Sequence, residues 1–419
     1  MKILVIGGGG REHAIVRQLY AEGGHEIYCA PGNGGISQIA NCVDIVAIDK
    51  KGMVEFAQKE GMDLVVVAPD DPLSIGMVDA MEEVGIKAFG PRQDAAQIEA
   101  SKAFAKDLMK KYGIPTAQYE VFSDPDAAKD YIEIQGAPIV VKADGLALGK
   151  GVFVCDTVAE ALSAVDEIMV KGNFGLSGRR VVVEEMLSGP EVSLLCFCDG
   201  THAIPMPPSQ DHKRAYDGDE GPNTGGMGAF APTPTFTPEL EKRTMEEIVN
   251  PTMEAMEKEG CPFHGVLYVG LMLTEDGPKV IEYNSRFGDP EAQAVLPLLK
   301  TPLSKVMLAT IDGDLSKMEI MFSDGAVACI VLASGGYPGK YETGKEITGL
   351  RDALEEGAIL YHSGTKLEDG KFYTAGGRVL GVTAMGDTLA EAIEKGYGFV
   401  EKIDFEGKHY RKDIGVKGK

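Results

Sequence analysis

The sequence predicts a multidomain protein of α/β and α+β class, with a doubly wound parallel sheet at its N-terminus. Three observations predict this class. The chain has 419 residues, which is too long for one ordinary hydrophobic core. Its first hundred residues alternate short apolar runs with helical stretches. The remaining residues hold longer strands, one long helix and a final region of short strands and turns.

The N-terminal region, expected over residues 1–100, carries four predicted strands and a helix from Glu12 to about Ala21. Apolar strands separated by helices are typical of parallel sheets that are covered on both faces. Loops containing Gly or Pro follow these strands, at the edge where ligands bind in such sheets. The predicted strands are Lys2–Ile6, Glu26–Ala30, Leu64–Ala68 and Lys87–Phe89.

A second region, expected over residues 101–324, opens with a helix from about Ser101 to Tyr112. Further helices are expected over Thr157–Val170 and Pro238–Glu259. After these, a small α+β domain is expected over residues 325–419, where Gly-rich turns alternate with short strands. The predicted strands of the second region are Pro138–Ala143, Val152–Cys155, Arg180–Glu185, Glu191–Cys198, Gly265–Leu273 and Pro278–Asn284.

Composition excludes several classes of partner. The net charge of −23 argues against general binding of nucleic acid or of an anionic membrane. No apolar run approaches the ~18 residues of a membrane span. Seven scattered cysteines without a C-x-x-C pair are typical of reduced thiols in the cytoplasm. We therefore expect a cytoplasmic protein that binds any phosphate through individually placed Lys and Arg residues. A monomer or weak dimer is expected, although composition does not determine the oligomeric state.

The loop Gly7–Gly10 follows the first strand and resembles a dinucleotide-binding turn without completing the pattern. The spacing G-x-G-x-x-G is absent, and no acidic residue ends the second strand, so NAD is not expected. A Gly-rich turn at a helix N-terminus still presents free N–H groups to an anion, and Arg11 adds further donors. We favour a phosphate or sugar-phosphate site here over a purely structural turn.

A second Gly-rich loop follows Lys142, which ends a strand of buried type. A charge there is costly unless an anion meets it. The loop is not a Walker A motif, because Gly151 stands where Ser or Thr is required. It is either a hairpin with solvated lysines or, as we favour, a lid over ATP phosphates.

Two further segments leave alternatives open. Glu184 and Glu185 end a strand, and they either face solvent or lie where adenine and ribose are held. The polar loops Gln210–Arg214 and Pro222–Gly228 suit a charged ligand, although Lys213 and Arg214 are also compatible with ordinary surface.

The most specific run is Val280–Glu291 (VIEYNSRFGDPE). Residues two apart on a strand share a face, so Glu282 and Asn284 should project together. A carboxylate and an amide oxygen beside phosphates suit Mg²⁺. Arg286 follows, placed to stabilise charge on a transferring phosphoryl group. Together with the loop after Lys142, this run predicts an enzyme that uses ATP and a metal ion.

These motifs resemble the ATP-grasp enzymes, and among them the glycinamide ribonucleotide synthetase family. The run Arg286–Gln293 (RFGDPEAQ) is similar to that family's own signature, and the resemblance covers the whole chain. Supporting matches include Gly9–Ala14, Ser101–Phe104, Lys142–Ala147, Gly221–Ala229 and Arg411–Gly415.

The resemblance implies a central ATP-grasp domain over residues 101–324, with a small lid subdomain at about 123–190. It implies that ATP activates glycine as glycyl phosphate, and that 5-phosphoribosylamine then displaces phosphate to give glycinamide ribonucleotide. This reaction belongs to de novo purine biosynthesis. Mg²⁺ or Mn²⁺ would assist it.

The resemblance also implies roles for individual residues. Glu282 and Asn284 would bind the metal, and Arg286, Asp289 and Glu291 would line the site of reaction. ATP would be held by Lys102, Lys142, Gly145, Gly149, Lys150, Gly151, Glu184, Glu185 and Glu191. The other substrates would be held by Gly10, Arg11, Glu12, His13, Pro31, Asn33, Asp70, Asp211 and Gly226.

Three positions depart from the family pattern. Asp70 stands where a longer Glu is common, and Ser285 where Cys is often found. The strand Gly265–Leu273 carries no acidic residue for a second metal contact, so one or two metal ions remain possible. Two hypotheses compete with this one. The first is another ATP-grasp ligase or carboxylase, and the second is a non-catalytic nucleotide-binding protein.

Overall fold

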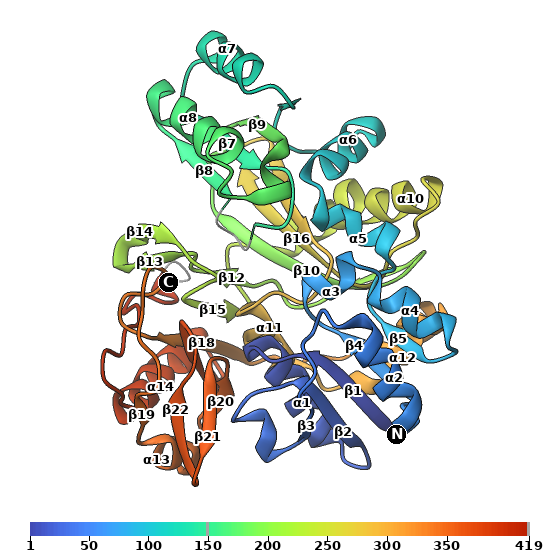
Figure 1. Ribbon diagram of the computed structural model, residues 1–419, viewed down its shortest axis with the longest axis vertical. Coiled ribbons are helices and arrows are strands. Elements are labelled where there is room, and N and C mark those ends of the chain that lie inside the picture. Colours follow the sequence, from blue (N-terminus) through green and yellow to red (C-terminus); the bar gives the residue numbers. More distant parts are fainter. Residues whose placement is uncertain (148–150, 417–419) are drawn as a thin grey trace.

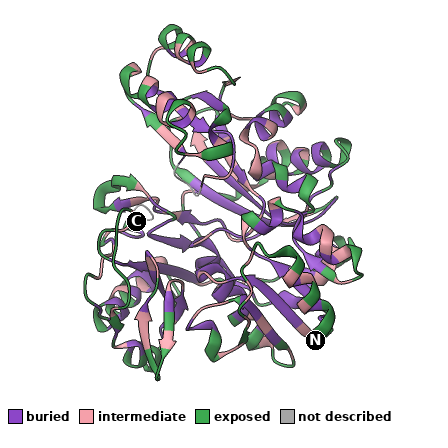
Figure 2. Ribbon diagram, viewed as in Figure 1, coloured by how far each residue is buried: buried purple, intermediate pink, exposed green. Residues whose placement is uncertain are grey.

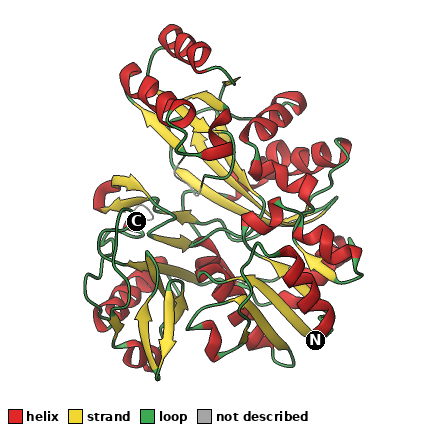
Figure 3. Cartoon of the chain, in the orientation of Figure 1, coloured by secondary structure: helices red, strands yellow, loops and turns green. Residues whose placement is uncertain are grey.

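The structure, a computed structural model, describes residues 1–147 and 151–416. It has an N-terminal body, a central body that carries a projecting lid, and a C-terminal body (Figure 1). Each is built on a β-sheet with helices packed on it (Figure 3), and the buried residues follow the strands (Figure 2). Among the described helices, none combines the length and apolarity needed to cross a membrane.

The N-terminal body is a parallel sheet with strand order β3-β2-β1-β4-β5. Alternate residues of β1 enter two separate hydrophobic clusters, so both faces are covered and the predicted doubly wound sheet is confirmed. The strand order reverses between β1 and β4, which is where such sheets bind ligands. The elements are β1 (Lys2–Gly7), α1 (Gly10–Glu22), β2 (Glu26–Pro31), β3 (Asn41–Cys42), α2 (Lys50–Glu60), β4 (Leu64–Val67), α3 (Asp70–Ser74), α4 (Met77–Glu83), β5 (Lys87–Phe89) and α5 (Gln93–Ala100).

The central body is an antiparallel sheet with order β11-β10-β16-β17. Its long strands carry near-continuous apolar runs because helices pack on both faces. A five-residue π-helical stretch, Met245–Val249, joins α9 to α10, so the predicted long helix is confirmed. The elements are α6 (Lys102–Tyr112), β10 (Glu191–Asp199), β11 (Ala203–Pro205), α9 (Pro238–Thr244), α10 (Asn250–Lys258), β16 (His264–Thr274), β17 (Gly277–Asn284), α11 (Glu291–Val295) and α12 (Leu303–Asp312).

The lid is a four-stranded antiparallel sheet, order β6-β9-β7-β8, that projects from the central body (Figure 1). Strands β7 and β8 form a hairpin, as the Gly-rich loop between them predicted. The elements are β6 (Tyr119–Phe122), α7 (Pro125–Gln135), β7 (Ile139–Ala143), β8 (Val152–Cys155), α8 (Val158–Val165) and β9 (Val181–Glu185).

The C-terminal body has an antiparallel sheet of order β12-β15-β18-β23-β20 and a small antiparallel sheet β19-β22-β21. Strand β12 lies in the predicted polar loop Gln210–Arg214, and β15 starts at the end of the predicted polar loop Pro222–Gly228, both of which were expected in the second region. They pair here because β18 needs a partner along its edge and Ala229, Phe230 and Ala231 are buried against it. The elements are β12 (Gln210–Asp211), β15 (Gly228–Ala231), β18 (Ala326–Ala333), β19 (Glu346–Ile347), α13 (Leu350–Glu355), β20 (Ile359–His362), β21 (Thr365–Glu368), β22 (Lys371–Thr374), β23 (Arg378–Gly386) and α14 (Leu389–Lys402).

Candidate active site

A cavity of about 1110 Å³, called the central cavity below, lies where the three bodies and the lid meet. Its walls come from α6, the lid strands, β10, β16 and β17, with Tyr337 and Arg378 from the C-terminal body. Most of the predicted site residues lie on these walls. They are Arg11, Asp70, Lys102, Lys142, Gly145, Gly151, Glu184, Glu185, Glu191, Asp211, Glu282, Asn284, Arg286, Asp289 and Glu291. The predicted contacts Gly149 and Lys150 lie outside the described residues.

Two buried lysines share one carboxylate on the lid side of the cavity. Lys142 Nζ lies 3.0 Å from Glu184 Oε2 and donates to Ile281 O at 3.1 Å. Lys106 Nζ also lies 3.0 Å from Glu184 Oε2 and donates to Thr116 Oγ1 at 2.7 Å. Burial lowers the pKa of Lys106 to about 8. Glu184 is therefore a counter-ion that keeps two cations inside the protein.

Sequence analysis missed Lys106, although a signal was present. Lys102 and Lys106 are four residues apart on α6 and so share a helix face. Lys102 Nζ donates to Gly145 O at 3.0 Å, and burial lowers its pKa. This contact ties the helix to the loop that follows β7.

Glu282 and Asn284 project together from β17 into the cavity, as predicted from their spacing. Lys213 Nζ lies 3.4 Å from Glu282 Oε1, and Asn284 Oδ1 accepts a hydrogen bond from Arg286 Nη2 at 3.0 Å. Burial alone raises the pKa of Glu282, but the surrounding lysines and Arg286 lower it to about 2. The carboxylate is therefore ionised at neutral pH.

The donor set fits a hard divalent cation. Burial and the charge of Glu291 raise the pKa of Asp211 to about 8, which shows how crowded the acidic groups around Glu282 are. The Glu282 carboxylate and the Asn284 amide oxygen are ligands that Mg²⁺ accepts. Within residues 1–147 and 151–416, no three His, Cys, Asp or Glu side chains form a metal-binding group. Glu282 and Asn284 would therefore share the ion with ligand oxygens and water.

The run Arg286–Gln293, called the signature run below, is held in place by ionic contacts from α5 and from the C-terminal body. Arg286 Nη2 lies 2.8 Å from Glu99 Oε1, and Glu99 Oε2 accepts from the backbone N–H and the hydroxyl of Ser285, both at 2.8 Å. Asp289 Oδ2 lies 3.1 Å from Arg378 Nη2. Sequence analysis missed Glu99, which lies in the last turn of α5 with nothing to mark it, and gave Arg378 no role.

Six predicted substrate residues lie away from the central cavity, and the side chains of three bind other parts of the protein. Glu12 accepts from Gly9 N at 2.6 Å and from Arg11 Nε at 2.7 Å. His13 Nδ1 accepts from the backbone N–H of His362 at 2.7 Å. The amide of Asn33 makes four hydrogen bonds, to Gly8, Gly35, Ile36 and His362. The six are Gly10, Glu12, His13, Pro31, Asn33 and Gly226.

Comparison with protein families matches three consecutive models to this chain. They are the N domain (residues 1–99), the ATP-grasp (A) domain (residues 100–292) and the C domain (residues 327–417) of phosphoribosylglycinamide synthetase. The chain belongs to the phosphoribosylglycinamide synthetase family. This confirms the resemblance drawn from the Arg286–Gln293 run.

Two relatives match this chain over almost its whole length. The chain is 48% identical to phosphoribosylamine–glycine ligase of Caldanaerobacter subterraneus subsp. tengcongensis, covering 99% of both chains. It is 49% identical to trifunctional purine biosynthetic protein adenosine-3 of Gallus gallus. That match covers 99% of this chain and 42% of the relative.

Solved structures confirm the fold. The crystal structure of phosphoribosylamine–glycine ligase from Thermotoga maritima has a TM-score of 0.86 at 35% identity, covering 99% of this chain and 100% of that one. The biotin carboxylase domain of Hydrogenobacter thermophilus 2-oxoglutarate carboxylase, solved with MgADP, has a TM-score of 0.75 at 16% identity. It covers 99% of this chain and 92% of that one. At that identity the second likeness concerns the fold alone, and it shows the same mixed α/β architecture.

Proposed function

We propose that the central cavity joins glycine to 5-phosphoribosylamine at the expense of ATP, giving glycinamide ribonucleotide, ADP and phosphate. The relatives named above as phosphoribosylamine–glycine ligases support this step of de novo purine biosynthesis. The observation that carries it is the convergence of Lys142, Glu282 and Arg286 on one cavity. These three groups supply, respectively, a cation for polyphosphate, a metal ligand and a cation at the reacting phosphoryl group.

The nucleotide occupies the lid side of the cavity in this proposal. Lys102 and Lys142 hold its phosphates beneath the β7–β8 loop, with Gly145 and Gly151 allowing close approach of the backbone. Glu184 Oε1 is buried and has no hydrogen-bond partner among the described residues. It is therefore an acceptor available to a ligand donor, and Glu185 and Glu191 lie on the same side for adenine and ribose.

Glu282 and Asn284 hold Mg²⁺ or Mn²⁺ in this proposal. When bound, the ion neutralises charge on the phosphate oxygens. Charged residues of the chain position the carboxylates and the phosphoryl group. Lys213 balances the excess of carboxylates around Glu282, and Arg286 faces the γ-phosphoryl group.

The chemistry proceeds in two displacements. A carboxylate oxygen of glycine attacks the γ-phosphorus, the bond to the ADP oxygen breaks, and an acyl phosphate forms. The amine of phosphoribosylamine then attacks the acyl carbon, and inorganic phosphate leaves as the amide forms. Arg286 stabilises charge on the transferring group, and Asp289 and Glu291 line the side from which the amine approaches. Positioning and electrostatics supply most of the rate in such reactions.

The phosphoribosyl group lies toward the N-terminal body, where Arg11 and Asp70 face the cavity. Both follow strands at the switch point of the parallel sheet. The division into domains 1–100, 101–324 and 325–419, the cytoplasmic location, and the monomeric or weakly dimeric state stay predictions. The matched ranges of the family models support the division.

A coupled ADP-release assay tests the proposal, with glycine, phosphoribosylamine and metal omitted in turn. ADP release should require glycine and metal, and Glu282→Ala should lower turnover by about a thousandfold. ADP formation with bicarbonate or formate in place of glycine would contradict the proposed substrate. Full turnover by the Glu282→Ala variant would contradict the metal assignment.

A further inference from the structure

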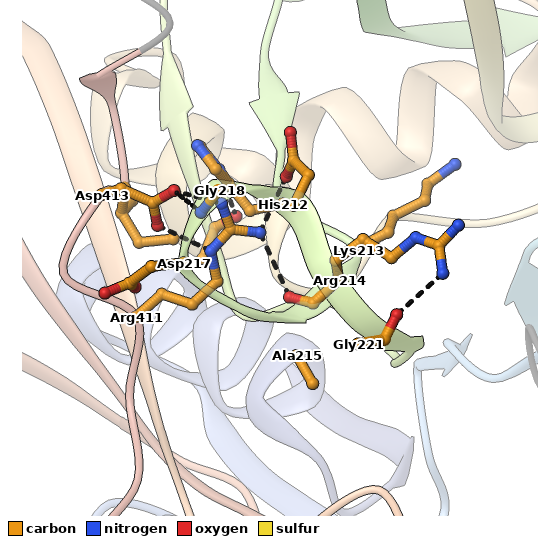
Figure 4. A network of polar contacts seen from close by, with 12 residues as sticks. His212, Lys213, Arg214, Ala215, Asp217, Gly218, Gly221, Arg411 and Asp413 are labelled. Atoms are coloured by element: carbon orange, nitrogen blue, oxygen red, sulfur yellow. Dashed lines mark hydrogen bonds and ion pairs between the residues drawn. The ribbon is translucent and has the colours of Figure 1, made fainter.

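A buried arginine near the C-terminus binds a loop that lines the central cavity. Arg411 opens the segment Arg411–Gly415, and its side chain is 0% exposed. Nε and Nη2 donate to the two carboxylate oxygens of Asp413 at 2.7 and 2.6 Å. Nη1 donates to Asp219 Oδ1 at 2.9 Å and to the carbonyl of Arg214 at 3.2 Å. One side of the guanidinium is thus held by the C-terminal tail, and the other holds the loop (Figure 4).

The same two segments are joined at several further points. The loop is a hairpin of β13 (Arg214–Tyr216) and β14 (Glu220–Asn223), connected by the turn Asp217–Asp219. Backbone and side-chain groups of residues 409–415 bind the turn and the residues that precede it. These contacts are Lys412 N to Asp217 Oδ1 at 2.7 Å, Gly218 N to Asp413 Oδ2 at 2.9 Å, His409 Nε2 with Ala215 O at 2.8 Å and Gly415 N to His212 Nε2 at 3.4 Å.

The same loop also lines the cavity. Lys213 Nζ lies 3.4 Å from Glu282 Oε1 and 3.7 Å from Glu191 Oε2. Arg214 and Asp219 also line the cavity wall. In Figure 4 the Lys213 side chain extends away from the Arg411 guanidinium. A shift of the loop would therefore move the Lys213 ammonium relative to Glu282.

We propose that Arg411 is a positioning residue, which sets the hairpin so that the Lys213 ammonium lies between Glu282 and Glu191. The role rests on the proposed ligase function of the cavity. Arginine suits it because the planar guanidinium reaches two carboxylates and a carbonyl at once, whereas a lysine ammonium presents a single charged point. A buried ionic cluster adds little net stability, but it fixes one geometry.

A double-mutant cycle in the full chain tests this role. Arg411→Gln should lower kcat at saturating substrates by about tenfold or more, because Lys213 is displaced from the site. In a Lys213→Gln background the same change should lower kcat less than about twofold, since the group through which Arg411 acts is already gone. Arg411→Lys should give an intermediate kcat.

Two further variants separate positioning from general stability. The Tyr397 hydroxyl donates to Arg411 O at 2.9 Å and accepts from Ile414 N at 3.0 Å, so it holds the backbone of the tail without touching the Arg411 guanidinium. Tyr397→Phe should lower the melting temperature and leave kcat unchanged. Asp219→Asn removes a charge from the hairpin side of the cluster, and Asn tolerates the left-handed backbone found there (φ 59°). It should lower kcat severalfold even if Arg411→Gln fails to fold.

The outcomes are distinct. Equal fold-losses from Arg411→Gln or Asp219→Asn with and without Lys213 would overturn the role of Arg411. An unchanged kcat in a folded Arg411→Gln protein would also overturn it. A wild-type protein that forms no ADP with glycine would instead contradict the proposed function.

Discussion

Glu99 gives the sharpest test of how the signature run is positioned. This carboxylate lies on α5, is 7% exposed, and makes a 2.8 Å ion pair with Arg286. It also accepts two hydrogen bonds from Ser285. Glu99→Ala leaves a largely buried guanidinium without its carboxylate, which should lower the free energy of unfolding by about 3–5 kcal/mol. Glu99→Gln keeps hydrogen-bonding atoms in place and should cost about 1–2 kcal/mol.

The effect on activity follows from the remaining contacts of Arg286. Its Nη2 also donates to Asn284 at 3.0 Å, but its Nε is buried without a hydrogen-bond partner among the described residues. Without Glu99 the guanidinium is held mainly by neutral oxygens. A displacement of about 1 Å at a reacting group costs roughly a hundredfold in rate, so Glu99→Ala should lower kcat by about that factor.

Urea unfolding measures the first quantity, and the coupled ADP assay, run where each variant is folded, measures the second. The matched control is Glu82→Gln, which breaks a 2.6 Å surface pair with Arg92. Exposed pairs contribute less than about 1 kcal/mol, so this variant should keep its kcat. A Glu99→Ala protein that is destabilised but retains the wild-type kcat would refute the positioning role.

Three other changes test residues in or near the cavity. Burial lowers the pKa of Lys106 from 10.5 to about 8, so between these values the unfolded chain binds the extra proton. Wild-type stability relative to Lys106→Met should therefore rise by about 3 kcal/mol from pH 8 to pH 10.5 in urea unfolding, and a flat difference would contradict this. Arg378→Met breaks the ion pair with the signature run and should raise the KM for phosphoribosylamine about tenfold. An increase in the KM for ATP instead would contradict the assignment of Arg378 to the phosphoribosylamine side of the cavity. Gly226→Ala should lower stability by about 2 kcal/mol or more in thermal unfolding, since φ is 110° and a Cβ would lie 2.4 Å from Pro290 Cδ. Gly23→Ala, which has a positive φ but open space, should cost less.

The sequence predicted the strands that carry strong apolar runs. β1, β10 and β16 each bury most of their residues, so their boundaries follow directly from hydrophobicity. β3 was missed because it has two exposed residues and no apolar pattern. β15 was missed for another reason: its pairing with β18 joins segments far apart in the chain, and no local signal shows this.

The sequence likewise predicted the residues that face the cavity better than those that hold them. Lys142 and Glu282 stand out because charges on strands of buried type are rare. Glu99 and Lys106 occupy helices, where charged residues are ordinary, so their burial appears only when the helices pack. The tail contacts of Arg411 are equally long-range and depend on how the C-terminal body meets the hairpin.

The charge of the protein explains why residues that face the cavity need other residues to hold them. A chain of net charge −23 that binds polyphosphate must concentrate cations in one place, and burying cations without partners is costly. Glu184, Glu99 and Asp289 meet this requirement by pairing with lysines or arginines at the cavity wall. Each pairing reduces the free positive charge but fixes the direction of a donor. The cavity therefore depends less on a bare positive potential than on cations held in place, which is what a reaction limited by positioning requires.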